Sequence, residues 1–189
     1  TDGTGAIKFL STLVGEYIKL KYKINITYNN YVLNPKDKVT NDEYNDDFKK
    51  YARGIGKLLH EKSAYHYKGT LINDDELNVI TGIINIEDLK KITKKYYCTI
   101  TCLIASLHIL AIQELYNMDS KKNNKQIKVS IPVNLRNYYE SKTMRNFSSY
   151  INIGIEPIYG NYSLEEIIKV IKNSMELNLT EKVLNSKIS

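Results

Sequence analysis

The clearest periodic pattern in the chain lies near its start, where apolar residues recur at helical spacing. These positions are Ile7, Leu10, Leu13, Val14, Tyr17 and Ile18. Lys8, Glu16 and Lys19 lie elsewhere on the same cylinder, so the pattern is amphipathic. It predicts a helix from about Gly5 to Tyr22, with Asp2 or Thr4 able to cap its free N–H groups.

The stretch from Ile127 to Ile155 contains two runs with the alternation of half-buried strands. The first run covers 127–131 and is expected to end at Pro132, because proline cannot donate to a sheet ladder. The second run covers 150–155. Arg136, Arg145, Asn134, Asn137 and Asn146 lie between the two runs. Taken alone, the pattern favours a hairpin-like sheet element with a solvated basic connection.

Further elements follow from local signals. Two strands are predicted within 69–85, the second at 78–84, and Asn85 should cap a helix ending near Lys95 with Asp88 as its capping-box partner. Thr99 or Thr101 opens a second helix that is apolar on most faces and is therefore expected to be buried. Ser163 and Glu166 form a capping box at the start of a closing helix.

The region from Ile24 to about Lys68 breaks these patterns and is predicted to be irregular and rich in loops, with a short helix at 48–60 interrupted by Gly54 and Gly56. With 189 residues, the chain is long enough for one domain or part of a larger one. The expected class is α/β, a mixed sheet covered by helices.

The composition gives only a general indication of which ligands the chain binds. The net charge is +6, spread along the chain, which favours anionic partners in general. Because no zinc-finger, helix-turn-helix or aromatic RNA-binding signature accompanies it, nucleic acid is not expected. The same charge would suit a coenzyme A phosphate or an acidic carrier protein.

Cys98 and Cys102 lie four residues apart in an apolar helical pattern, without further ligands at zinc spacing. Reduced, buried thiols and a cytoplasmic setting are therefore expected, and no metal. No apolar run is expected to reach the length of a membrane span. The chain begins Thr1-Asp2-Gly3 without an initiator methionine, which predicts a piece of a longer protein or a processed one.

The central sequences PVNLR and RNFSSYINIGI resemble the second half of chloramphenicol-acetyltransferase-like proteins. That superfamily includes alcohol O-acyltransferases and the condensation domains of peptide synthetases. The helix opened by T-x-T before the central stretch is also similar. The resemblance extends from Asp2 to about Met175 and implies an incomplete C-terminal lobe of a two-lobed fold. The chain has no tryptophan and so lacks the D-F-G-W-G-type motif of the family.

The diagnostic motif of that superfamily is H-x-x-x-D-G before a long helix, and Asp2-Gly3 looks like its end. The motif histidine would lie three positions before Thr1, so the resemblance places no catalytic residue within the chain. It implies that Asp2 pairs with Arg136 as a structural brace, although Asp2 could instead only cap the helix. Asn152 matches the family's strand asparagine or is an ordinary strand residue, and Ser148 stands where condensation domains usually have glycine.

The three histidines of the chain do not replace the missing one. His108 lies within the apolar helix, where a core histidine is expected, and His60 and His66 have no partner carboxylate at informative spacing. The resemblance therefore implies part of an acyl-CoA-dependent O-acyltransferase of the alcohol acetyltransferase type. The alternatives are a non-catalytic binding or scaffold member of the same fold and a condensation-domain fragment. It also implies three partners: acyl-CoA as co-substrate, an alcohol or amine acceptor, and a missing N-terminal lobe. The oligomeric state is left open, and the chain alone is expected to be inactive.

Overall fold

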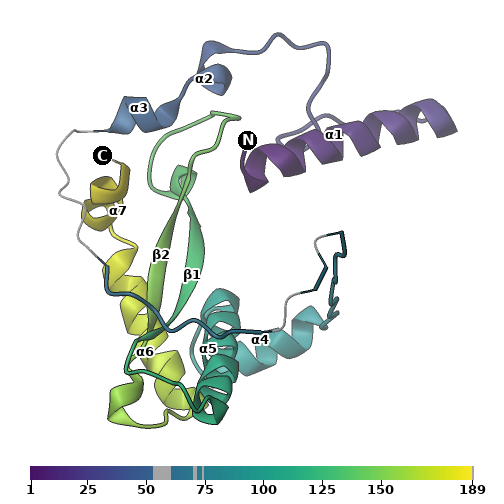
Figure 1. Cartoon of the computed structure of the whole chain (residues 1–189). Coiled ribbons are helices and arrows are strands. Elements are labelled where there is room, and N and C mark those ends of the chain that lie inside the picture. The colour runs from purple at the N-terminus through teal and green to yellow at the C-terminus, as the bar shows by residue number, and fades with distance from the viewer. Residues whose placement is uncertain (53–60, 70–71, 74, 189) are drawn as a thin grey trace. The chain divides into compact units, whose positions relative to one another are not determined.

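A computed structural model describes residues 1–52, 61–69, 72–73 and 75–188. In chain order, its helices and strands are α1 (Gly3–Tyr22), α2 (Asn41–Tyr44), α3 (Asp47–Tyr51), α4 (Ile86–Lys95), α5 (Ile100–Met118), β1 (Ile127–Asn134), β2 (Ser148–Ile155), α6 (Leu164–Asn178) and α7 (Glu181–Ile188) (Figure 1). Short 3₁₀ turns follow each strand, at Leu135–Asn137 and Pro157–Tyr159. The general α/β class is confirmed.

The chain divides into two compact units, each made of separate stretches of sequence. Unit 1 contains Thr1–Leu58, Pro132–Ser149 and Glu181–Ser189. Unit 2 contains Leu59–Ile131 and Tyr150–Thr180. The first therefore holds α1, α2, α3 and α7, and the second holds α4, α5 and α6.

The predicted first helix is confirmed as α1, which begins at Gly3 after the N-cap Asp2. Its apolar stripe is largely exposed, as at Phe9, which is 70% exposed, and Gly5 is its one buried residue. Most of the following region, as far as it is described, is irregular as expected, with only the short helices α2 and α3. Much of the predicted helix at 48–60 lies outside the described residues.

Strands β1 and β2 form a two-stranded sheet. They are antiparallel, since the Leu135 amide donates to the Phe147 carbonyl beyond one end and Gly154 lies against Ile127 at the other. A single parallel bridge joins Ala64 to Gln126 just before β1. Among the described residues, the sheet is therefore smaller than the mixed sheet that the sequence predicted.

Pro132 does not end the first strand, and that prediction is wrong. Because amides alternate in direction along a strand and Leu135 donates toward β2, the nitrogen of Pro132 faces away from β2. β1 has no second neighbour in the described sheet, so the proline removes no ladder hydrogen bond. The strand continues to Asn134 and carries the chain directly to Arg136.

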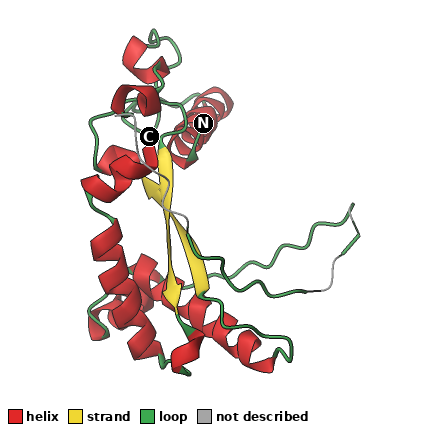
Figure 2. Cartoon of the chain, turned by 60° about the vertical axis from the view of Figure 1, so that its left-hand side comes forward, coloured by secondary structure: helices red, strands yellow, loops and turns green. Residues whose placement is uncertain are grey.

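The strands predicted within 69–85 are also not found in the described part of that region. Residues 75–84 form a loop leading to α4 (Figure 2), with Ile80 94% and Ile83 97% exposed. A β-rich sequence cannot form a strand without a ladder partner. Asn85 does cap α4, but by accepting from the Glu87 amide, and Asp88 pairs with Lys91 instead of completing a capping box.

Helices α5 and α6 pack against each other and form the core of unit 2. Thr99 caps α5 and Ser163 with Glu166 form the predicted capping box of α6. The face of α5 that carries Leu103 and Ile109 is buried, whereas Ile104 and Leu107 are exposed. The expectation of burial on most faces is therefore wrong, because α6 and α4 cover only part of the cylinder.

By length and composition, α5 is also apolar enough to cross a membrane, contrary to the expectation from sequence. The core helix of a folded domain can have the same length and hydropathy, and α5 packs against α6 as a core helix does. Helix α7 was not predicted. It buries Leu184 and Ile188 in unit 1, where it packs against α3.

Candidate functional site

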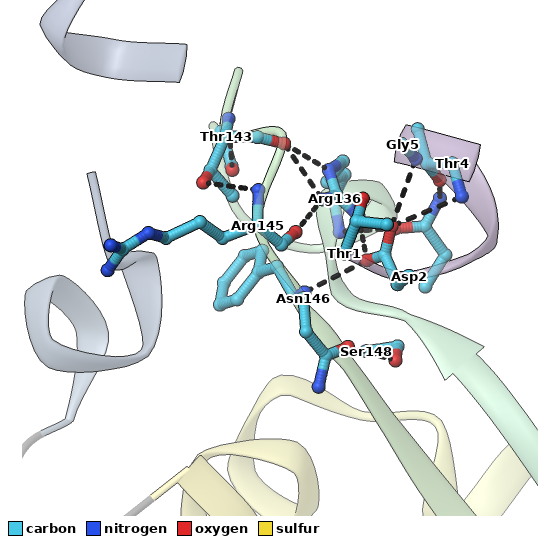
Figure 3. A network of polar contacts seen from close by, with 12 residues as sticks. Thr1, Asp2, Thr4, Gly5, Arg136, Thr143, Arg145, Asn146 and Ser148 are labelled. Atoms are coloured by element: carbon cyan, nitrogen blue, oxygen red, sulfur yellow. Dashed lines mark hydrogen bonds and ion pairs between the residues drawn. The ribbon is translucent and has the colours of Figure 1, made fainter. Parts of the chain in front are cut away.

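Asp2 uses both carboxylate oxygens to join the start of α1 to the loop before β2 (Figure 3). Oδ1 accepts hydrogen bonds from the amides of Thr4 at 3.1 Å and Gly5 at 3.2 Å, which is the capping role. Oδ2 accepts from Arg136 Nη1 at 2.7 Å and from the Phe147 amide at 2.9 Å. The two alternatives for Asp2, helix cap and partner of Arg136, are therefore both realised.

Arg136, the ion-pair partner of Asp2, also donates hydrogen bonds to the loop before β2. It lies in the 3₁₀ turn after β1, and its guanidinium donates to the Thr143 carbonyl from Nε at 3.2 Å and from Nη2 at 2.8 Å. Nη2 also donates to the Arg145 carbonyl at 2.8 Å, and Nη1 to Asn134 Oδ1 at 3.2 Å. One side chain thus ties the 143–147 loop to the end of β1 and to Asp2. We call this arrangement the Asp2–Arg136 brace.

The brace is nearly closed to solvent, with the Arg136 side chain 11% and the Asp2 side chain 7% exposed. Burial alone would raise the pKa of Asp2. The hydrogen bonds from the Phe147 amide, the Arg136 guanidinium and the Gly5 amide outweigh that effect and lower the pKa below its ordinary value. Asp2 is therefore ionised near neutral pH, and the charges of the pair compensate each other.

The geometry excludes Asp2 as a proton acceptor in catalysis. A carboxylate offers about four lone-pair sites, and Asp2 accepts four hydrogen bonds. A base must instead have a lone pair directed at its substrate. The arrangement can hold a backbone segment in place, and it holds the first turn of α1 against the 143–147 loop.

Residues that the sequence did not single out complete the brace. The Thr1 hydroxyl donates to the Met144 carbonyl at 2.8 Å, and Thr143, 1% exposed, donates to the Asn45 carbonyl at 2.6 Å. A Cβ at Gly5 would collide with the Thr1 hydroxyl and lie 2.8 Å from the Met144 carbonyl oxygen. Gly3, the motif glycine, has open space where a Cβ would be.

Ser148 and Asn152 make their contacts elsewhere. The Ser148 hydroxyl donates to Asn146 Oδ1 at 2.8 Å, next to the brace in sequence (Figure 3). Asn152 Nδ2 donates to Glu61 Oε2 at 2.6 Å within unit 2, so its amide is half-buried and paired. These contacts account for both side chains without a ligand.

One of the three histidines, His108, differs from the prediction in its exposure to solvent. His108 is exposed on α5, so the prediction of a core histidine is wrong. His66 is exposed, and His60 lies outside the described residues. The described residues contain no group of three or more histidine, cysteine, aspartate or glutamate side chains able to hold a metal ion. Cys102 is buried, Cys98 is half-buried, and both thiols are free.

Comparison with known proteins gives one family. The family model described as alcohol acetyltransferase matches residues 47–157, more than half of the chain. The match includes Arg136, Ser148 and Asn152 and begins after Asp2. Searches of the curated proteins and of the solved structures gave no match. The chain belongs to the alcohol acetyltransferase family, in agreement with its resemblance to chloramphenicol-acetyltransferase-like proteins.

Proposed function

We propose that this chain is part of an enzyme that transfers an acyl group from acyl-CoA to the hydroxyl of an alcohol. The observation that carries the proposal is the alcohol acetyltransferase match over 47–157. The Asp2–Arg136 brace supports it, because the resemblance assigns this pair a structural role beside the catalytic histidine. The same match favours this reading over a condensation-domain fragment.

The proposed base is a histidine three positions before Thr1. Its neutral imidazole takes the hydroxyl proton as the alcohol oxygen attacks the thioester carbonyl. The carbon–sulfur bond then breaks, and the coenzyme A sulfur leaves and takes up a proton. Histidine suits this step because its ordinary pKa lies near neutrality.

In this proposal the brace positions the base. Asp2 lies four residues after the proposed histidine and is fixed by its contacts to Arg136 and Phe147. Thr1, the residue before Asp2, is fixed by its hydrogen bond to the Met144 carbonyl. Small displacements of a catalytic group are costly, since a misplacement of about 1 Å can reduce the rate about 100-fold.

The missing N-terminal lobe is the proposed partner within the same protein. Support comes from the 75–84 loop of unit 2, where Leu77 is 88% exposed and Ile80 and Ile83 almost fully so. Adjacent exposed aliphatic side chains of this kind mark a surface that another part of a protein covers. The alternation in this loop would suit an added strand.

Release of the coenzyme A thiol from acetyl-CoA in the presence of a simple alcohol tests the proposal. The protein that includes the residues before Thr1 should turn over, and replacing the proposed histidine by alanine should reduce the rate about 10²- to 10⁴-fold. Arg136→Lys should lower kcat with little change in KM for the alcohol. Thr99→Ala, which removes a helix cap in unit 2, is the matched control and should keep the rate.

Two results would contradict the mechanism. Turnover by the chain Thr1–Ser189 alone would show that no upstream histidine is needed. Absence of turnover from the longer protein with every alcohol and acyl-CoA supplied would identify a non-catalytic member of the family used for binding or as a scaffold.

A further inference from the structure

A large cavity in unit 1 lies beside α1 and is also lined by Met144 and Arg145, from the loop that the brace holds. Its volume is about 830 Å³, within the range of about 300–1,000 Å³ that is usual for ligand pockets. Phe9 and Leu13 of α1 form one wall, Leu33 and Val39 belong to the irregular region, and Met144 comes from the loop before β2. Asp2 and Arg136 are not among its lining residues, so an assay of this cavity does not depend on acyl transfer.

The walls of the cavity are joined by hydrogen bonds and not only by apolar packing. The Leu33 amide donates to Thr12 Oγ1 at 2.8 Å, and that hydroxyl donates to the Lys8 carbonyl of α1 at 2.7 Å. Tyr28 donates to Glu16 at 2.7 Å and accepts from Lys19 at 2.8 Å. The irregular segment is therefore anchored to α1 at two places, which gives a pocket formed before any ligand arrives.

The apolar walls remain open to solvent. Leu13 is 54% and Val39 75% exposed, although both line the same hollow. Covering such side chains is favourable by about 25 cal/mol for each Å² of apolar surface removed from water. A hydrocarbon chain would supply that cover without needing any polar partner along its length.

The acidic side chains that line the cavity already have hydrogen-bond partners within the chain, whereas its cations have no acidic partner among the described residues. Its three acids all accept hydrogen bonds from this chain: Glu16 from Tyr28, Asp37 from Asn34 at 2.8 Å, and Glu43 from Thr40 at 2.8 Å. Of its two cations, Arg145 stacks its guanidinium over the Tyr44 ring at 4.8 Å, and neither Arg145 nor Lys38 has an acidic partner among the described residues. The Arg145 side chain extends away from Asp2 and Arg136 (Figure 3).

We infer that this cavity binds a free aliphatic carboxylate, with the hydrocarbon chain against Phe9, Leu13 and Val39 and the carboxylate on Arg145. A guanidinium presents paired N–H donors that match the two oxygens of a carboxylate. The stacking on Tyr44 holds this group at the cavity wall while leaving its edge free to donate. Each of the three acids already accepts a hydrogen bond from a donor of the chain, which leaves the two cations as the charged groups of the cavity without a partner of opposite charge among the described residues.

The three methionines make a direct binding assay available. Met144 lines this cavity, Met175 lines a second cavity between α4, α5 and α6, and Met118 lines a third near Tyr65. In protein labelled at the methionine methyl groups, decanoate should shift the Met144 signal in a saturable way and leave those of Met175 and Met118 in place. Decanol and decylammonium, with the same chain and a neutral or positive head group, should bind at least tenfold more weakly.

Variants of the head-group residue complete the test. Arg145→Gln should raise the Kd for decanoate about tenfold or more, since a hydrogen bond to a charged group is lost. Arg145→Lys should fall between this variant and the unchanged protein. Lys125→Gln removes one positive charge outside the cavity and should bind normally. Equal binding of decanol or decylammonium, unchanged affinity in Arg145→Gln, or a shift at Met175 or Met118 instead of Met144 would overturn the inference.

Discussion

Replacing Asp2 by alanine removes a helix cap and one member of a nearly buried ion pair in a single step. Loss of an N-cap costs about 0.5–2 kcal/mol. Removing one partner of a buried pair costs about 3–5 kcal/mol, because the other charge stays buried. Arg136 keeps the carbonyls of Thr143 and Arg145 and the Asn134 side chain as acceptors, so the ion-pair loss falls at the lower end. We expect a total of about 3.5–5 kcal/mol.

Chemical denaturation followed by circular dichroism gives the free energy of unfolding of each variant. Thr99→Ala is the matched control, since Thr99 only caps α5 through the Cys102 amide at 3.1 Å. It should lose about 1 kcal/mol. The difference between the two variants measures what Asp2 contributes beyond capping.

A double-mutant cycle with Arg136→Ala isolates the pair itself. The coupling energy between the two positions should be about 2 kcal/mol, within the range for residues in direct contact. Hydrogen exchange at the Phe147 amide should speed up in Asp2→Ala, because Asp2 is its acceptor at 2.9 Å. The reasoning is refuted if Asp2→Ala loses no more stability than Thr99→Ala, or if the coupling falls below about 0.5 kcal/mol.

Three further predictions concern the same chain. Gly3→Ala should be neutral or slightly stabilising, whereas Gly5→Ala should lose about 1–3 kcal/mol through overpacking; equal melting temperatures for the two would contradict this. Gly154→Ala should lose a similar amount or more, because its Cβ would collide with the Ile127 carbonyl oxygen, and retention of native stability would count against the observed strand register. The lowered pKa of Asp2 adds stability that is present above about pH 4 and is lost as the pH falls through the folded-state pKa. Asp2→Asn should therefore lose less stability on acidification than the unchanged protein. Unfolding measured at a series of pH values tests this.

Local signals in the sequence predicted most of the regular structure. The apolar period of 3.6 residues located α1, α5 and α6. The predicted caps, Asp2 or Thr4, Thr99 or Thr101, and Ser163, include the N-caps found, which are Asp2, Thr99 and Ser163. These signals succeed because a helix satisfies its backbone hydrogen bonds within itself. The strand predicted at 78–84 failed for the opposite reason, since a strand depends on a partner that its own sequence does not specify.

The brace was predictable only in part. Resemblance to a known family paired Asp2 with Arg136, which lie 134 positions apart. No local pattern indicated that Thr143 and Gly5 would support them, because Gly5 matters through a close approach to the Met144 carbonyl and not through its own backbone conformation. His108 was misplaced because apolar neighbours in sequence do not determine which face of a helix a second helix covers.

The central claim is that Asp2-Gly3 ends an H-x-x-x-D-G motif, whose histidine is held in position by the Asp2–Arg136 brace. The most direct measurement is the sequence of the coding region immediately before the Thr1 codon. The account predicts a histidine codon three positions before Thr1. Any other residue at that position would contradict the proposed mechanism and favour a non-catalytic member of the family.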